Sequence, residues 1–219
     1  MQQHRNGNQE VIVVIDIGMG NTGSILNMFR KLRIDAILSS EAAQIAAAER
    51  IIIPGVGAFD HGIRALRERN LCKPLTQAAL VDRKPTLGIC LGMQMLGRSS
   101  EEGGETGLGW IAASCRKFQP KLDPFGRVDK VPHMGWNYLG GMKPHPLLEG
   151  ADQDTRFYFV HSYHVVCDHS EDEIASSWFG GAPFTAISGR GNIAGVQFHP
   201  EKSHRYGMRL LKNFSAWRP

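Results

Sequence analysis

Continuous apolar runs alternate with amphipathic stretches through the first half of the chain. The runs cover residues 11–15, 34–38, 50–53 and 85–89. Because they are rich in β-branched residues and do not alternate with polar ones, they predict strands buried on both faces of a parallel sheet. Helical spacing of apolar residues follows them, over residues 25–32, 41–49, 59–66 and 74–82. This order predicts an open, mostly parallel α/β sheet flanked by helices, with right-handed crossovers.

The pattern changes after residue 110, where short β-branched or alternating stretches are separated by Gly, Pro and Asp. Such stretches predict antiparallel strands over residues 110–118, 126–131, 136–139, 156–167, 174–178, 184–188 and 193–198. A final helix is expected to bury Leu210, Leu211 and Phe214, with Ser203 as its N-cap. We interpret this half as an added antiparallel β section packed beside the parallel core. Residues 11–219 then form a single domain behind a polar tail at residues 1–10.

Composition narrows the class of protein further. The 219 residues are 42% hydrophobic and 21% charged, as in an ordinary globular domain. The net charge of +4 comes from scattered basic residues with no run of five, which argues against a nucleic-acid or membrane surface. The cysteines are far apart and the N-terminus lacks the apolar core of a signal peptide, so we expect a reducing, cytoplasmic location.

A candidate nucleophile stands where the fourth apolar run meets a helix-like stretch. Cys90 lies between Gly88 and Gly92, and Gly-x-Cys-x-Gly at a strand-to-helix junction is the thiol form of a nucleophile elbow. Glycines suit the tight turn, and backbone N–H groups at a helix N-terminus favour a thiolate. The alternative is a small buried cysteine in a glycine-rich turn.

A nucleophilic thiol needs a base, and the base needs an orienting group. His199 follows an apolar strand, and Pro200 stiffens the segment so that Glu201, two residues on, projects to the same side. Glu201 is therefore expected to orient His199, leaving the second ring nitrogen for Cys90. By itself, this pair is better explained as a strand-end histidine beside a helix-capping carboxylate, and the presence of the Gly-x-Cys-x-Gly motif reverses that preference.

Acyl chemistry also needs donors for an oxyanion. The amide of Leu91 is one by elbow geometry. The loop Gly55-Val56-Gly57, at the end of the third run, is suited to supply another, because glycines let an N–H approach closely or turn. An ordinary turn after that strand is the alternative.

Two other patterns are weaker. Gly18-Met19-Gly20 lacks the third glycine of a dinucleotide-binding loop. His161 and His164 fall on opposite faces of one expected strand and have no acidic or thiol ligand beside them, so we expect no metal site. Asp16, His61 and His133 are interpreted as structural or peripheral, and no cofactor is expected.

Together the motifs resemble the class I, triad-type glutamine amidotransferases. The matching stretches are Pro54-Gly55-Val56-Gly57, Gly88-Ile89-Cys90-Leu91-Gly92-Met93-Gln94 and Gly195-Val196-Gln197-Phe198-His199-Pro200-Glu201. Further stretches are similar to the glutaminase subunits of imidazole glycerol phosphate synthases: residues 16–21, 157–163 and Val131-Pro132-His133-Met134-Gly135-Trp136-Asn137. The resemblance covers about residues 11–215 and implies a flavodoxin-like sheet.

The resemblance implies that Cys90, His199 and Glu201 hydrolyse glutamine to glutamate and ammonia through a thioester. It places the substrate among Gly55, Gly57, Gln94, Glu101, His161, Ser162 and Tyr163, with the choice between Glu101 and Glu102 for the α-ammonium left open. It also implies that the Val56 peptide points the wrong way until a partner binds.

The implied partner is a (β/α)8 cyclase subunit that uses the ammonia to form imidazole glycerol phosphate and AICAR in histidine biosynthesis. The partner-facing residues would be Asn21, Pro132, His133, Met134, Trp136, Asn137 and Lys202. Ile17 and Thr22 depart from the family's usual residues near this edge, which leaves partner affinity open. Exposed Met134 and Trp136 would mark a docking surface, whereas a core position for both is the alternative.

Three other functions compete. Another amidotransferase subunit, serving pyridoxal phosphate or purine synthesis, is disfavoured by the 131–137 run. A thiol hydrolase or peptidase of the α/β type would place its acid between nucleophile and histidine, whereas Glu201 follows His199. A non-catalytic scaffold would not need Cys90, His199 and Glu201 together.

Overall fold

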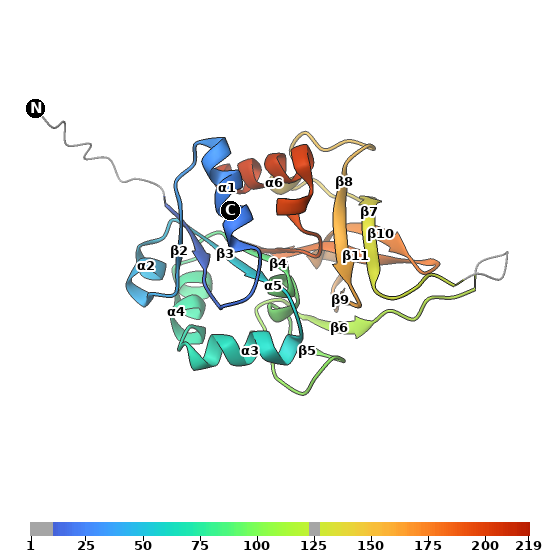
Figure 1. The fold of residues 1–219 in the computed structure, drawn as a ribbon, viewed down its shortest axis with the longest axis horizontal. Coiled ribbons are helices and arrows are strands. Elements are labelled where there is room, and N and C mark those ends of the chain that lie inside the picture. Colours follow the sequence, from blue (N-terminus) through green and yellow to red (C-terminus); the bar gives the residue numbers. More distant parts are fainter. Residues whose placement is uncertain (1–10, 123–127) are drawn as a thin grey trace, which may run out of the picture.

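In the part of the chain that the structure describes, a mixed sheet of ten strands forms the centre of the protein (Figure 1). The computed structural model describes residues 11–122 and 128–219, so the expected tail at 1–10 and the start of the strand expected at 126–131 lie outside the described residues. The sheet order is β2-β1-β3-β4-β12-β11-β9-β6-β5, with β10 paired to β11. Its first strands are β1 (Ile12–Ile15), β2 (Ala36–Ser39), β3 (Arg50–Gly55) and β4 (Thr86–Cys90). The others are β5 (Ser99–Ser100), β6 (Ala113–Lys117), β9 (Tyr163–Cys167), β10 (Glu173–Phe179), β11 (Ala182–Arg190) and β12 (Ile193–Val196).

Helices cover both faces of the parallel strands (Figure 1). They are α1 (Thr22–Leu32), α2 (Ala42–Ala47), α3 (Phe59–Glu68), α4 (Cys72–Thr76), α5 (Leu91–Met95) and α6 (His204–Ala216). Alternate residues of β1 enter two hydrophobic cores: Val14 packs with α1 and α6, whereas Val13 packs with α3, α4 and α5. This two-sided burial is why the strand reads as a continuous apolar run. The described residues include no helix that is both long and apolar enough to cross a membrane.

The mostly parallel sheet with an antiparallel section is confirmed. Strands β2, β1, β3, β4 and β12 pair in parallel. The antiparallel strands do not pack beside this core, however, because β11, β9 and β6 continue the same sheet. A separate two-stranded sheet contains β7 (His133–Tyr138) and β8 (Arg156–His161). Strand β12 lies between β4 and β11, so a late segment of the chain occupies the middle of the sheet.

Several local expectations were wrong in detail. The stretch 156–167 is not one strand: it breaks at Ser162 into β8 and β9, which belong to different sheets. The helix expected at 74–82 is α4 followed by a π-helical turn, Gln77–Val81. Ser203 stands at the N-cap of α6, but its hydroxyl accepts from Tyr158 N and donates to His199 O instead of capping the helix.

Candidate active site

Cys90 occupies a strained turn at the carboxyl end of β4. Its φ of 54° and ψ of −107° are unusual for a residue with a side chain, and strain of this kind costs about 1–3 kcal/mol. The flanking glycines make the turn possible. A Cβ on Gly92 would lie 1.8 Å from Ile53 O, and one on Gly88 would lie 2.7 Å from Gly92 O. Close packing of α5 against β3 and β4 therefore holds the thiol at the strand end.

His199 reaches Cys90 because β12 runs parallel to β4. Gly195 is in register with Gly88 and Val196 with Ile89, so the segment after β12 leaves the sheet at the edge where Cys90 lies. His199 N donates to Tyr158 O at 2.9 Å. The histidine backbone is thus held by β8 while its side chain faces the elbow.

Glu201 orients the His199 ring as expected, although the segment is a 3₁₀ turn (Pro200–Lys202) and not an extended one. The Nδ1–Oε1 distance is 2.8 Å, and both side chains are only 2% exposed. Burial lowers the pKa of His199, but interactions with Cys90 and Glu201 outweigh it and raise the pKa to about 10. Nε2 of His199, the ring nitrogen left for Cys90, has no hydrogen-bond partner among the described residues. Hydrogen bonds between catalytic groups commonly tighten when substrate binds.

A cavity of about 450 Å³ opens beside the thiol. It is lined by Val56, Gly57, Ala58, Cys90, Leu91, Gln94, Glu102, Pro132, Val160, His161, Ser162, Tyr163 and His199. The expected oxyanion donors Leu91, Val56 and Gly57 are therefore all at its wall, and Gly57 has a φ of 101°. Gly55 lies behind the wall, where a Cβ would contact Leu91 Cβ at 3.0 Å.

The acidic residue of the cavity is Glu102, and the assignment of Glu101 to the substrate site was wrong. Glu102 Oε2 accepts from Phe59 N at 2.8 Å and lines the cavity. Glu101 instead accepts from Lys117 N at 2.8 Å and lies outside the cavity. Both residues lie in a turn after β5, closed by a hydrogen bond from Gly103 N to Ser100 O, and their different partners send the two carboxylates to different sides.

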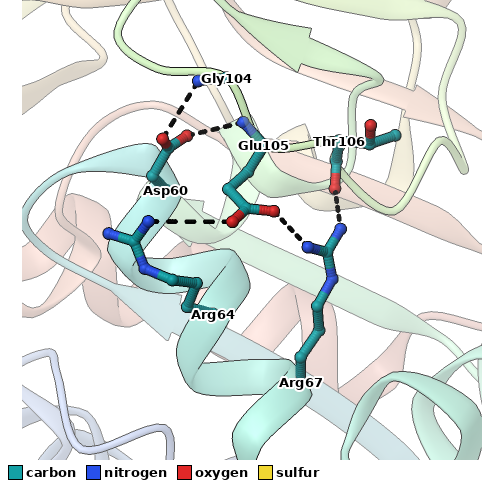
Figure 2. A network of polar contacts seen from close by, with 6 residues as sticks. All are labelled: Asp60, Arg64, Arg67, Gly104, Glu105 and Thr106. Carbon is teal, nitrogen blue, oxygen red and sulfur yellow. Dashed lines mark hydrogen bonds and ion pairs between the residues drawn. The ribbon is translucent and has the colours of Figure 1, made fainter.

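The loop that carries Glu102 is attached to α3 by a polar network (Figure 2). Asp60 accepts from Gly104 N at 3.1 Å and from Glu105 N at 3.0 Å, and these bonds lower the pKa of its carboxyl. Glu105 pairs with Arg64 and Arg67. Because Phe59 N also binds Glu102, the start of α3 fixes the loop at both ends of the network.

Two side-chain amides connect the cavity wall to the sulfur. Gln94 Nε2 donates to Tyr163 O at 3.1 Å and to Gln197 Oε1 at 3.2 Å. Gln197 is fully buried, and its Nε2 donates to Cys90 Sγ at 3.8 Å. The sequence interpretation did not single out Gln197, although it stands inside the Gly195–Glu201 motif two residues before His199.

The expected partner surface is exposed at β7, except at buried His133 and half-buried Asn137. Met134 is 62% exposed and Trp136 is 44% exposed, so the core alternative for both was wrong. Asn21, Pro132 and Lys202 are exposed as well. His133 is buried, and its assignment to the surface was wrong. Period-two alternation along β7 was the available signal, because it places His133 and Asn137 on the face opposite Met134 and Trp136.

His161 and His164 do not share a strand, contrary to the expectation. His161 ends β8, whereas His164 lies in β9. Within the ranges 11–122 and 128–219, no group of three His, Cys, Asp or Glu side chains is arranged to hold a metal ion.

Comparison with known proteins supplies the family. The family model for glutamine amidotransferase class-I matches residues 13–216. A relative from Pseudomonas aeruginosa, imidazole glycerol phosphate synthase subunit HisH 2, is 48% identical over 204 residues, 93% of this chain and 98% of that protein. A relative of the same name from Methanococcus maripaludis is 44% identical over 204 residues, again 93% and 98%.

Solved structures agree on the fold. PurLQS from Thermotoga maritima matches with a TM-score of 0.68 at 16% identity, covering 94% of this chain and 97% of that one. The glutaminase domain of Trypanosoma brucei CTPS, with bound acivicin, gives 0.64 at 15% identity and 95% of each chain. The chain therefore belongs to the class I glutamine amidotransferases. Within that family, its relatives at 48% and 44% identity are the HisH subunits of imidazole glycerol phosphate synthase.

Proposed function

We propose that this chain hydrolyses glutamine to glutamate and ammonia and supplies the ammonia to a cyclase subunit that forms imidazole glycerol phosphate and AICAR in histidine biosynthesis. The observation that carries the proposal is the strained Cys90 elbow beside the buried His199–Glu201 pair, at the wall of a cavity. The 48% identical relative is itself named as a subunit of that synthase, which supports the same assignment.

In the proposed reaction, His199 takes the proton of the Cys90 thiol and the sulfur attacks the amide carbon of glutamine. Glu201 stabilises the resulting imidazolium through Nδ1. The negative charge on the former carbonyl oxygen is accepted by the Leu91 amide and by an amide of the 55–57 loop. His199 returns its proton to the leaving nitrogen, so ammonia departs and a thioester to Cys90 remains. Water, deprotonated by His199, then releases glutamate and restores the thiol.

Glutamine lies in the cavity with its α-ammonium at Glu102, the acidic residue of the cavity wall. Gln94, Gly57 and the His161-Ser162-Tyr163 segment surround the rest of the substrate, and Gly55 supports Leu91 from behind. A carboxylate within hydrogen-bond reach of an ammonium forms a charge-assisted bond, which is stronger than a neutral one. This placement leaves the amide end of glutamine at Cys90.

The partner is a (β/α)8 cyclase that docks on the face of β7 carrying Met134 and Trp136, together with Asn21, Pro132 and Lys202. Residues 11–219 act as one domain in the cytoplasm, and the reaction needs no cofactor. The glycines on either side of Val56 let the Gly55–Val56 peptide flip at low cost, so the Val56 N–H completes the oxyanion site only when the liganded partner is bound. A subunit that hydrolysed glutamine alone as fast as the complex does would contradict this last point.

The test is the variant Cys90→Ala in the complex with the cyclase. Ammonia release from glutamine should fall to background, while synthesis with added ammonium salt stays within about twofold of the wild type, because the thiol acts only in making ammonia. Loss of both activities would show that the two reactions are not divided between the subunits as proposed. Alkylation of Cys90 by a glutamine analogue provides an independent readout of the nucleophile.

A further inference from the structure

A buried histidine pair joins β7 to the active-site cavity. His133 Nδ1 lies 3.2 Å from His161 Nε2, and His161 Nδ1 lies 2.8 Å from Tyr163 O. At the other end, Asn137 Nδ2 lies 3.3 Å from His133 Nε2 and donates to Trp178 O at 2.6 Å. His161 and Tyr163 line the cavity, whereas Asn137 belongs to the strand that exposes Trp136.

The donor and acceptor of every hydrogen bond between Asn137 and Tyr163 follow from the groups at the two ends of this series. The amide of Asn137 is fixed because Nδ2 donates to a carbonyl and Oδ1 accepts from Tyr138 N at 2.9 Å. His133 Nε2 must then accept, so its proton is on Nδ1 and points to His161. Tyr163 O can only accept, which independently places the His161 proton on Nδ1 and leaves its Nε2 to accept from His133. Both ends give the same pair of tautomers.

The surroundings keep both rings neutral. His133 is 5% exposed and His161 is 6% exposed. Aromatic rings enclose them: Phe179 lies 4.5 Å from His133 and Phe184 lies 5.3 Å from His161, centroid to centroid. Burial lowers the pKa of His133 to about 4 and that of His161 to about 3. Neutral, singly protonated rings are the form that a one-way chain of donors requires.

The series of hydrogen bonds continues beyond Tyr163. The same carbonyl oxygen accepts from Gln94 Nε2, which also donates to Gln197 Oε1, and Gln197 Nε2 donates to Cys90 Sγ. Each of these amides is buried, so neither can rotate to a water-bonded alternative at low cost. An unbroken series of hydrogen bonds thus connects Asn137 with the sulfur of Cys90.

We propose that His133 is a positioning residue for glutamine hydrolysis: through His161, Tyr163 and the two glutamine amides it sets the geometry at Cys90 according to the position of β7. The proposal rests on the proposed function, because β7 is the strand on which the cyclase is proposed to dock. His133 touches neither substrate nor thiol. Its effect on the reaction passes through the orientation of Tyr163 O and of Gln94, which lie at the cavity wall.

The tautomers are tested first, on the full isolated chain, by long-range ¹⁵N–¹H correlation spectra of the histidine rings. Protons on Nδ1 of both His133 and His161 are expected, and an Nε2 proton on either ring would overturn the proposal. In Asn137→Asp the carboxylate can only accept a hydrogen bond, so the proton of His133 must move from Nδ1 to Nε2. The lone pair left on His133 Nδ1 then faces the lone pair on His161 Nε2. The His161 signals should therefore change as well, and unchanged His161 signals would also overturn it.

The effect on catalysis is tested in the complex with the cyclase. His133→Phe fits the aromatic surroundings but has no N–H, and should lower kcat for glutamine hydrolysis about tenfold while synthesis with added ammonium salt stays within about twofold. His133→Asn can again donate to His161 and should recover to within about threefold of the wild type. Phe179→Leu is the matched control, because it loosens the packing around His133 without removing a donor, and its kcat should change by less than twofold.

The outcomes separate the two proposals. If the wild-type complex releases no ammonia from glutamine, the proposed function fails, and the ring spectra still decide whether the polarised chain exists. If the wild type is active and His133→Phe keeps its kcat within twofold, the positioning role is wrong. It is equally wrong if Phe179→Leu lowers kcat as much as His133→Phe, because the residue is then only part of the packing.

Discussion

Replacing Glu201 by glutamine tests how the triad distributes charge. The wild-type contact is a buried Nδ1–Oε1 pair at 2.8 Å, and the second oxygen, Oε2, has no partner among the described residues. In Glu201→Gln the amide either keeps its oxygen at Nδ1 and buries an unpaired N–H, or turns and donates to Nδ1. The first arrangement costs stability, about 1–3 kcal/mol. The second arrangement places the proton of neutral His199 on Nε2, so that this nitrogen can no longer accept the proton of the Cys90 thiol.

The magnitude follows from the His199 pKa. Its rise from 6.5 to about 10 is the net effect of Cys90 and Glu201 acting against burial. At about 1.4 kcal/mol per pH unit, the two partners favour the imidazolium by about 5 kcal/mol net. The Glu201→Gln substitution removes one of these two partners, so kcat should fall by at least about tenfold. KM for glutamine should stay within about twofold, because Glu201 does not line the cavity.

The pH dependence has a definite sign. The imidazolium persists up to its raised pKa, so glutaminase activity of the wild-type complex should decline only as the pH approaches about 10. Without the carboxylate the pKa falls, and the alkaline limb should move at least one pH unit lower. A raised pKa also stabilises the fold below the unfolded value of 6.5, and this contribution is lost as the pH rises through about 10. The difference in unfolding free energy between wild type and Glu201→Gln should therefore shrink over that range.

The assay is glutamate production by the complex, coupled to glutamate dehydrogenase, from pH 6 to the limit of protein stability. Glu101→Gln is the matched control: it removes a carboxylate from a neighbouring part of the fold that lies outside the cavity, and should leave both kcat and the alkaline limb unchanged. The reasoning is refuted if Glu201→Gln retains wild-type kcat with an unmoved alkaline limb.

Three further substitutions, one of them with a matched control, have direct expectations. Glu102→Gln should raise KM for glutamine about tenfold or more with little loss of kcat, since it removes the charge proposed to bind the α-ammonium; steady-state kinetics check this, and an unchanged KM counts against Glu102. Gly92→Ala should destabilise the fold by more than about 2 kcal/mol in urea unfolding and abolish glutaminase activity, because the added Cβ would lie 1.8 Å from Ile53 O. Gly23→Ala is the control: a Cβ there has no atom within 4 Å, so this variant should be neutral or stabilising by about 0.5–1 kcal/mol. Trp136→Ala should weaken cyclase binding in titration calorimetry by about tenfold and leave the ring spectra of His161 unchanged; wild-type affinity would remove β7 from the interface.

Much of the parallel half of the fold could be read from the sequence, because a strand buried on both faces needs an uninterrupted apolar run and leaves that mark locally. The elbow at Cys90 was readable for a similar reason: a non-glycine residue at a φ of 54° needs glycines at fixed positions beside it. His199 and Glu201 were accessible because the orienting contact spans only two residues.

Other features depend on contacts that no local pattern encodes. Glu101 and Glu102 are chemically equal, and contacts far away in the sequence, with Phe59 N for Glu102 and with Lys117 N for Glu101, decide which one faces the cavity. The network from Asp60 on α3 holds the loop that follows them (Figure 2). The break between β8 and β9 has no Gly or Pro to mark it in the sequence. The chain turns at Ser162 toward a different sheet. The histidine pair was missed because its members are assigned by the sequence to two separate roles, and only the pairing of β7 with β8 brings them together.

The insertion of β12 between β4 and β11 has a consequence for the making of the protein in the cell. During synthesis Cys90 leaves the ribosome well before His199, and at roughly 5–20 residues per second the delay is on the order of 5–20 seconds. Through that interval the position beside β4 is open, and the thiol has neither its base nor the buried Gln197 amide. The nascent chain therefore carries a cysteine that is not yet a glutaminase nucleophile.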